Sequence, residues 1–100
     1  MGRGTTKKHT FTVPYDTSLI QTIRVVYAQG GDIIFKKSGN DVQLNGNVVT
    51  VNLSQQDTFK FSHKLPVEIQ LRSLLKSGDV KNSNILKTTV KRCLDDEVLV

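Results

Sequence analysis

Leu65-Pro-Val-Glu-Ile-Gln-Leu-Arg72 is the stretch of sequence that decides the fold. From Leu65 to Leu71 an apolar side chain occupies every second position, and from Glu68 onward a polar side chain occupies each position between. Because successive side chains of a strand point to opposite faces, this period of two predicts a strand that buries one face and exposes the other. Shorter alternating runs at residues 10–13, 22–27 and 48–53 predict further strands of the same kind.

Turn signals separate these runs. Gly30-Gly31-Asp32 and Asn45-Gly46 predict tight hairpins, because glycine adopts the positive φ that two-residue turns require. About seven short strands follow one another at intervals of about 8 to 12 residues, a pattern typical of antiparallel β-sandwiches. The sequence therefore predicts an all-β, two-sheet antiparallel sandwich. The residues expected in its core are Phe11, Val13, Ile23, Val25, Tyr27, Val49, Val51, Leu53, Phe59, Phe61, Val67, Ile69 and Leu71.

A polar segment interrupts the strand pattern between residues 54 and 58. Ser54 offers an oxygen that can cap a single helical turn, and Phe59 and Phe61 follow as apolar anchors. The run Leu53-Ser-Gln-Gln-Asp-Thr-Phe-Lys-Phe61 resembles the corner between strands E and F of immunoglobulin-type domains, where the chain crosses from one sheet to the other. Paired cysteines and a core tryptophan are missing, so the resemblance implies an immunoglobulin-like architecture and nothing more specific.

The length of the chain and its single cysteine bound the domain organisation. One hundred residues fit one domain, expected at residues 9–100 and preceded by a disordered basic tail at residues 1–8. Cys93 has no partner for an internal disulfide, so folding does not require an oxidising compartment. The first residues lack the apolar segment of a secretory signal, and no apolar run approaches the roughly 20 residues that span a bilayer. Cytoplasmic synthesis without membrane association is expected.

The sequence offers no set of residues for catalysis, and no cofactor is expected. His9, His63 and Cys93 are too few for a four-ligand zinc site and lack a marked third group for a nucleophilic triad. Both histidines are expected at the surface, and Cys93 as a small buried or half-buried residue. The run Asp95-Asp96-Glu97 lacks the spacing and the glycine of a calcium loop and is expected to be a solvated acidic segment.

A net charge of +5 permits an acidic partner, and nucleic acid is the first to consider. Nucleic-acid binding usually combines basic side chains with exposed aromatic rings on which bases stack. Here most of the aromatic residues fall on the apolar phase of their strands, so they are expected in the core. Nucleic-acid binding therefore stays the alternative function, with a basic surface at Arg24, Lys36, Lys37 and Arg72.

The order of five motifs along the chain is similar to that of small uncharacterised proteins encoded in phages and prophages of Gram-positive bacteria. The motifs begin at His9 (HTFTVPYD), Ile23 (IRVVYAQG), Val51 (VNLSQQDTF), Val67 (VEIQ) and Leu94 (LDDEVL). Those proteins are similar in layout to the N-terminal, virion-attaching domain of baseplate upper proteins. The resemblance implies a virion structural or assembly module, made in the host cytoplasm, whose partners are tail or baseplate proteins or further copies of itself. It implies no catalytic or binding residues.

The leading hypothesis is a non-enzymatic module that acts by protein–protein contact along an edge strand. An unpaired edge exposes main-chain groups to which a partner can add a strand. The candidate edges are the first strand, at residues 10–13, and the last, at residues 87–93. Their outward positions are Thr10, Thr12, Lys87, Thr89 and Lys91.

Overall fold

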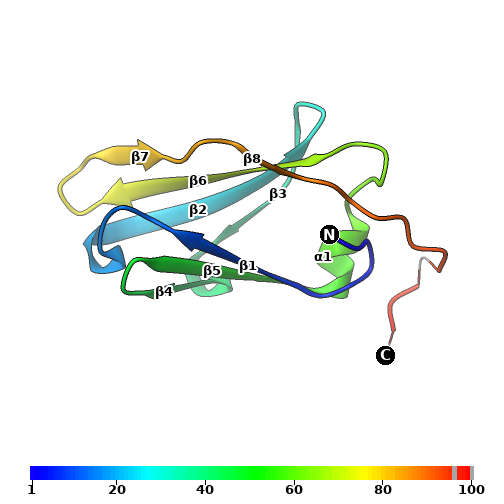
Figure 1. Cartoon of the computed structure of the whole chain (residues 1–100). Coiled ribbons are helices and arrows are strands. Elements are labelled where there is room, and N and C mark those ends of the chain that lie inside the picture. The colour runs from blue at the N-terminus through cyan, green and yellow to red at the C-terminus, as the bar shows by residue number, and fades with distance from the viewer. Residues whose placement is uncertain (96, 100) are drawn as a thin grey trace.

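The computed structural model describes residues 1–95 and 97–99, and its strands form two antiparallel sheets stacked as a sandwich (Figure 1). The smaller sheet has the strand order β1-β5-β4, with β1 at Lys7–Thr12, β5 at Val48–Leu53 and β4 at Val42–Asn45. The larger has the order β3-β2-β6-β7, with β3 at Asp32–Ser38, β2 at Ile20–Gln29, β6 at Val67–Leu75 and β7 at Val80–Asn82. A further strand, β8 at Leu86–Thr88, pairs with the first part of β6. The predicted all-β sandwich is confirmed, with eight strands among the described residues.

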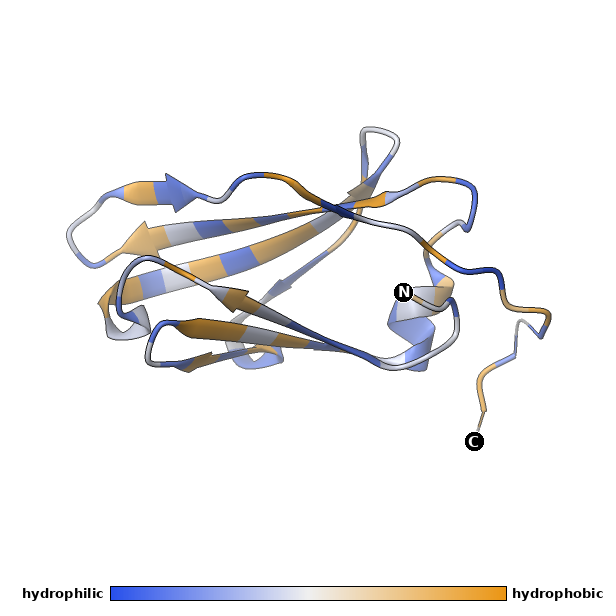
Figure 2. Cartoon of the chain, in the orientation of Figure 1, coloured by the Kyte–Doolittle hydropathy of each residue, from blue (hydrophilic) through white to orange (hydrophobic). Residues whose placement is uncertain are grey.

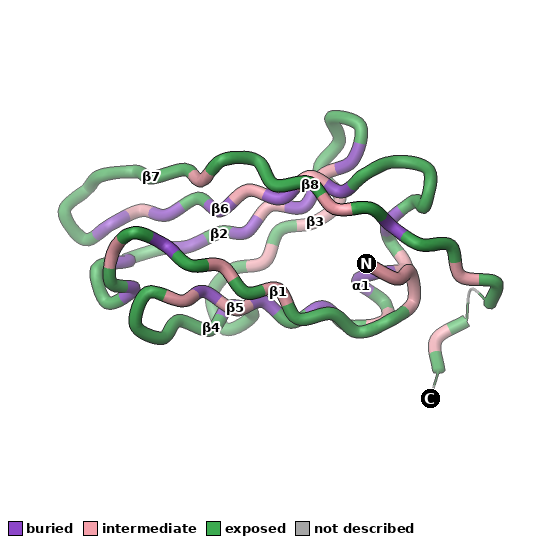
Figure 3. The backbone as a smooth tube through the Cα atoms, viewed as in Figure 1, coloured by how far each residue is buried: buried purple, intermediate pink, exposed green. Residues whose placement is uncertain are grey.

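The core lies between the two sheets, where the alternating apolar residues of both meet (Figures 2 and 3). Every residue expected in the core is buried except Phe11 and Phe59, which are half-buried. The largest fully buried side chains are Tyr27 and Phe61, whose ring centroids lie 6.0 Å apart. Phe35 packs against both rings, with centroids at 4.9 Å from Tyr27 and 5.2 Å from Phe61. An aromatic cluster thus occupies one end of the sandwich.

The two predicted hairpins are present. Gly30 and Gly31 join β2 to β3 with φ angles of 57° and 86°, and Gly46 lies between β4 and β5 with φ of 59°. The β2–β3 turn has positive φ at both central residues and the β4–β5 turn has it only at the first, Gly46; both conformations match the right-handed twist of the flanking strands. Two short 3-10 helices, at Thr17–Leu19 and Gly39–Asp41, complete the connections between β1 and β2 and between β3 and β4.

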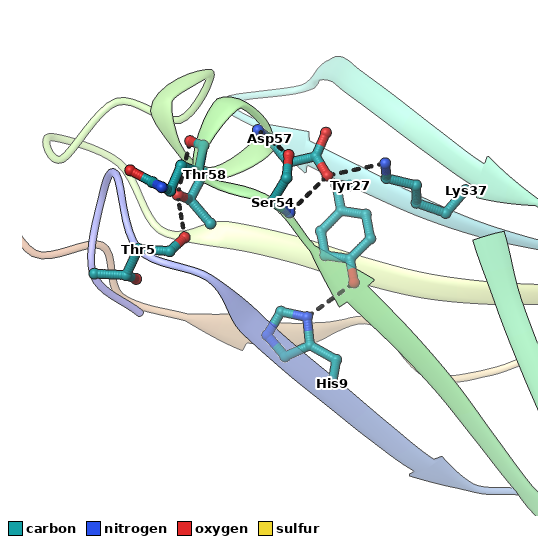
Figure 4. Close-up of polar contacts among 8 residues, drawn as sticks. Thr5, His9, Tyr27, Lys37, Ser54, Asp57 and Thr58 are labelled. Carbon is teal, nitrogen blue, oxygen red and sulfur yellow. Dashed lines mark hydrogen bonds and ion pairs between the residues drawn. The ribbon is translucent and has the colours of Figure 1, made fainter. Parts of the chain in front are cut away.

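The crossing from β5 to β6 contains the helix α1, at Gln55–Phe59, where a capped turn was predicted (Figure 4). The Ser54 hydroxyl accepts a hydrogen bond from the Asp57 backbone at 3.1 Å, and the Asp57 carboxylate accepts one from the Ser54 backbone at 2.9 Å. This reciprocal pair satisfies two amide groups that the helix itself leaves without acceptors. The Thr58 hydroxyl donates to the Thr5 carbonyl at 2.7 Å. No helix of the described chain is long and apolar enough to cross a membrane.

The N-terminal residues differ from the predicted disordered tail. Lys7 and Lys8 belong to β1. Residues 1–3 run parallel to the segment that follows β8: the Arg3 amide donates to the Lys91 carbonyl at 3.1 Å, and the Lys91 amide donates to the Met1 carbonyl at 2.8 Å. Main-chain hydrogen bonds hold this segment, and side-chain hydropathy does not reveal such bonds. The prediction of a disordered tail at residues 1–8, which was based on small polar side chains, was therefore wrong.

The C-terminal third differs in two further places. Residues 76–84 carry no alternating pattern, yet they contain β7, whose Lys81 lies opposite Ser73 of β6. The last strand, predicted at residues 87–93, is shorter than expected, because only Leu86–Thr88 forms a strand. Both strands are three residues long and lie at a sheet edge, so backbone pairing with β6 and not side-chain burial holds them. Asp96 and Val100 lie outside the described residues.

Candidate protein-interaction edge

One side of β1 is unpaired. The strand lies at the end of the three-stranded sheet, and among the described residues only β5 pairs with it. The Val13 amide donates to the Asn47 carbonyl on the β5 side at 2.9 Å. Because N–H and C=O groups alternate in direction along an antiparallel strand, Phe11 then faces β5 as well, whereas the main-chain groups of Thr10 and Thr12 face outward. Both threonine side chains are also exposed.

A groove runs beside this edge, between β1 and the segment at residues 81–86 of the other sheet. Two adjoining hollows make it, and they share Thr12, Val13, Leu71, Ser83 and Asn84 as lining residues. Its floor is apolar, since Val13 and Leu71 are core residues. Phe11 and Leu86 line the second hollow, and Leu86 is 45% exposed. The groove therefore combines unpaired main-chain groups with apolar surface, which are the two requirements for adding a strand.

The second predicted edge is only partly open. Lys87 is exposed in β8, opposite Glu68. The Thr89 carbonyl, however, accepts a hydrogen bond from the Met1 amino group at 2.9 Å. Lys91 exchanges both of its main-chain hydrogen bonds with residues 1–3. The prediction that Thr89 and Lys91 lie at a free edge was therefore wrong, because the N-terminal segment, which was expected to be disordered, pairs with that edge.

His9 connects β1 to the core. Its Nδ1 lies 2.8 Å from the Tyr27 hydroxyl, and the two rings stack with centroids 5.7 Å apart (Figure 4). Burial lowers the pKa of His9, and the positive charges of Lys7 and the N-terminus lower it further. Burial and the Asp57 carboxylate raise the pKa of Tyr27, so its hydroxyl keeps its proton and can donate to the neutral imidazole. His9 is thus half-buried, and the prediction of a surface histidine was wrong for it; His63 is exposed as expected.

Asp57 forms an ion pair with Lys37, with 2.9 Å between Oδ2 and Nζ (Figure 4). Burial opposes ionisation of the carboxyl group, but hydrogen bonds from the Ser54 backbone and Lys37, the charge of Lys37 and the Ser54 hydroxyl together lower its pKa. The side chain of Lys37 is only 17% exposed. The prediction that Lys37 belongs to the basic surface was therefore wrong: its side chain lies on the same inward-facing side of β3 as Phe35.

The other three predicted basic residues share the outer face of the large sheet. Arg24 of β2 lies directly opposite Arg72 of β6, and Lys36 of β3 lies opposite Val26. All three side chains are exposed. Arg72 donates from Nε to the Asn82 side-chain oxygen at 3.1 Å. The structure thus brings the two arginines together across one strand pair and leaves Lys37 on the other side of the sheet.

The remaining reactive side chains do not converge. The Cys93 thiol is half-buried and donates to the Asp95 carbonyl at 2.9 Å. Asp95 and Glu97 are exposed, whereas Asp96 of the predicted acidic segment is outside the described residues. In the part of the chain that the structure describes, no group of three or more His, Cys, Asp and Glu residues is placed to hold a metal ion.

Comparison with known proteins supports the fold and leaves the family open. No protein-family model matches the chain, and no curated protein matches it. Among solved structures it is similar to the immunoglobulin-like domain of mouse leukocyte-associated immunoglobulin-like receptor 1, described as a strand-swapped dimer, with a TM-score of 0.54 and 11% identity over 92% of this chain and 85% of that one. A strand-swapped dimer of the extracellular domain of the same receptor gives a TM-score of 0.53 and 12% identity over the same shares. The sandwich is therefore immunoglobulin-like, as predicted.

Sequence reasoning missed the groove and the His9–Tyr27 contact. The groove depends on how far apart the edges of two sheets lie, and no local pattern encodes that distance. The contact could have been sought, because His9 falls on the same strand phase as Phe11 and Val13. That phase indicates an inward side chain.

Proposed function

We propose that this chain is a non-enzymatic structural or assembly module that acts by protein–protein contact, through strand addition to the free edge of β1. The observation that carries the proposal is the outward direction of the Thr10 and Thr12 main-chain groups beside the open groove. A partner strand that pairs with these groups gains hydrogen bonds in a fixed register. The partner's alternate side chains then cover Phe11 and Leu86.

The chemistry of the groove defines the partner segment. It is extended, carries apolar side chains at alternate positions, and has no proline at the positions that pair with Thr10 and Thr12. Ser83 and Asn84 on the opposite wall favour polar side chains at the positions between. Such a segment completes the smaller sheet and removes an open edge from solvent.

The resemblance to small phage proteins supports placing this contact in a tail or baseplate, with another virion protein or a second copy as the partner. The two similar receptor structures are described as strand-swapped dimers, so an immunoglobulin-like sandwich can associate by sharing a strand. This precedent supports self-association as one form of the contact. The module is then made in the host cytoplasm and incorporated into the virion.

Nucleic-acid binding is the second candidate, and one observation favours it: Arg24 and Arg72 lie side by side on an exposed face, with Lys36 on the same face. Salt concentration separates the two functions. Binding driven by phosphate contacts weakens steeply between about 50 and 200 mM salt, because each contact releases a bound cation. Strand addition over an apolar groove changes little over the same range.

A proline scan of β1 tests the proposal. Thr10→Pro removes an outward donor and leaves the β5 ladder intact, since proline is tolerated at the free side of an edge strand. We expect it to reduce self-association or virion incorporation at least tenfold in sedimentation velocity or incorporation assays. Leu86→Lys, which leaves every strand hydrogen bond in place, is expected to do the same. The control Lys36→Glu is expected to have little effect.

The opposite pattern would overturn the proposal. If Lys36→Glu alone abolishes association and both groove variants still associate, the partner binds the basic face and not the β1 edge. Circular dichroism and urea unfolding establish that each variant is folded before its association is compared.

A further inference from the structure

Arg24 and Arg72 form a like-charge pair at the surface of the large sheet. They lie directly opposite on two paired strands, where Cβ atoms are only about 4.5 to 5.5 Å apart. Within the described residues neither guanidinium forms an ion pair, and Arg72 donates to the side-chain oxygen of Asn82. Like charges placed this way destabilise a sheet. An anion that bridges both guanidiniums would convert this repulsion into attraction.

The surroundings of the pair indicate what kind of anion fits. A shallow hollow of about 190 Å³ lies between the two arginines, lined also by Thr22, Leu74 and Val80. Val80 is 56% exposed, so apolar surface borders the charges. A guanidinium binds a carboxylate through two parallel hydrogen bonds. A guanidinium binds phosphate in the same geometry, so it is the apolar border that favours a carboxylate-bearing segment with apolar neighbours over an isolated phosphate.

The chain itself contains a segment of that composition. Asp95, Asp96 and Glu97 follow one another, and apolar residues flank them on both sides. Leu94 is 91% exposed and Leu99 is 75% exposed, so these flanks are not buried in the core. The segment is attached to its own domain through Gln55, whose side-chain amide donates to the Leu99 carbonyl at 2.9 Å and accepts from the Leu99 amide at 2.8 Å.

The segment cannot reach the arginine pair of its own domain in this structure. The molecule is 47 Å along its longest axis, and the chain after β8 runs toward the end that carries α1 (Figure 1). The hairpin between β6 and β7 lies at the other end, and Arg72 sits beside β7, opposite Asn82. A contact between the segment and the arginine pair is therefore made between two molecules.

We propose that the Arg24–Arg72 pair of one copy binds the acidic C-terminal segment, residues 94–99, of a second copy. The carboxylates neutralise the two guanidiniums, and the flanking leucines cover Leu74 and Val80. The two surfaces lie on different parts of the molecule, so each copy offers one of each. Such a head-to-tail contact builds a ring where the rotation closes and a filament where it does not. It goes beyond the β1 contact, which involves neither surface.

A charge exchange tests this contact with the full-length chain. One variant carries Arg24→Glu and Arg72→Glu, and the other carries Asp95→Lys, Asp96→Lys and Glu97→Lys. We expect each variant alone to associate at least tenfold more weakly than the wild type in sedimentation velocity at about 50 mM salt. An equimolar mixture restores association, because each surface then meets its complement. The control Lys64→Glu alters an exposed charge in the loop before β6, away from the sheet face that carries the arginine pair, and is expected to associate as the wild type does.

Three results would overturn the proposal. The first is a wild type that stays monomeric up to about 1 mM. The second is a mixture that associates no better than its two components. The third is a segment variant that associates normally while the arginine variant loses binding to a duplex oligonucleotide, which assigns the arginine pair to nucleic acid. Repeating the exchange with Thr10→Pro in both variants separates this contact from the β1 edge: restoration persists if the two contacts are independent.

Discussion

The Tyr27 hydroxyl and the Nδ1 atom of His9 lie 2.8 Å apart and connect the two sheets of the sandwich. Tyr27 comes from β2, an inner strand of the larger sheet, and is fully buried, whereas His9 comes from β1 at the edge of the smaller one. The edge strand that we propose as the contact surface is thereby attached to the aromatic cluster. This contact holds β1 in position even though only one of its sides is paired.

The stability of the fold should depend on the charge of His9. Burial, Lys7 and the N-terminus lower its pKa in the folded state below the ordinary value of 6.5, so the unfolded chain takes up a proton first. The contribution of His9 to the free energy of unfolding is therefore fully present above about pH 6.5, and it decreases as the pH falls from there toward the folded-state pKa. We expect urea unfolding midpoints to fall over this range in the wild type.

His9→Gln provides the comparison for that pH series. Its amide oxygen can still accept from Tyr27, but the side chain does not titrate. The variant should lose the decrease between pH 6.5 and the folded-state pKa of His9. A wild type and a variant with parallel pH profiles would show that the proton on His9 does not affect folding.

Asp57→Asn should destabilise the corner between the sheets. The carboxylate accepts from the Ser54 backbone and pairs with Lys37, and the amide retains only part of this. We expect a loss of about 1 to 2 kcal/mol at pH 7, in the range of a lost helix cap. Because the pKa of Asp57 is lowered in the fold, the wild type should lose this advantage as the pH falls below about 4. Equal stability at pH 7 would contradict the role of the ion pair and cap.

Phe61→Ala should remove the centre of the aromatic cluster. The ring is 1% exposed and packs between Tyr27 and Phe35. Truncating a buried phenylalanine costs about 3 to 5 kcal/mol, which urea unfolding measures directly. Leu65→Ala is the matched control, because Leu65 is 45% exposed and should change stability by less than about 1 kcal/mol. A loss below about 1 kcal/mol for Phe61→Ala would place the ring outside the core.

Arg24→Thr should stabilise the isolated domain while it weakens association. Removing one guanidinium relieves the repulsion from Arg72, and threonine suits a strand. We expect a gain of about 0.2 to 1 kcal/mol in unfolding free energy at concentrations where the protein is monomeric. The same gain should disappear at high salt, where exposed charges are screened. A loss of stability at every salt concentration would mean that Arg24 supports the fold.

The strands and the core were predictable from sequence because their signals are local. The alternation from Val67 to Leu71 identified the inward face of β6, and glycine pairs identified the hairpin between β2 and β3. Ser54 and Asp57 lie three residues apart, which is the spacing of a capping box. Each of these features depends only on residues that lie within a few positions of one another in the sequence.

The arrangement of the edges was not predictable in this way. Whether Thr89 and Lys91 are free depends on residues 1–3, which lie almost ninety positions away in sequence and pair through the main chain. Lys36 and Lys37 are neighbours in sequence, but only the phase of β3 decides which of them faces outward. Long-range backbone pairing and strand phase therefore determine the candidate sites, and both require the complete fold.

Hydrogen exchange at the β1 amides tests the central claim most directly. In the monomer the amides of Thr10 and Thr12 face solvent and should exchange quickly, whereas the Phe11 amide, paired with β5, should be protected. In the associated state, strand addition predicts at least a tenfold slower exchange at Thr10 and Thr12 and little change at Phe11. Thr10 and Thr12 amides that exchange equally fast in the monomer and in the assembled protein would contradict a contact along this edge.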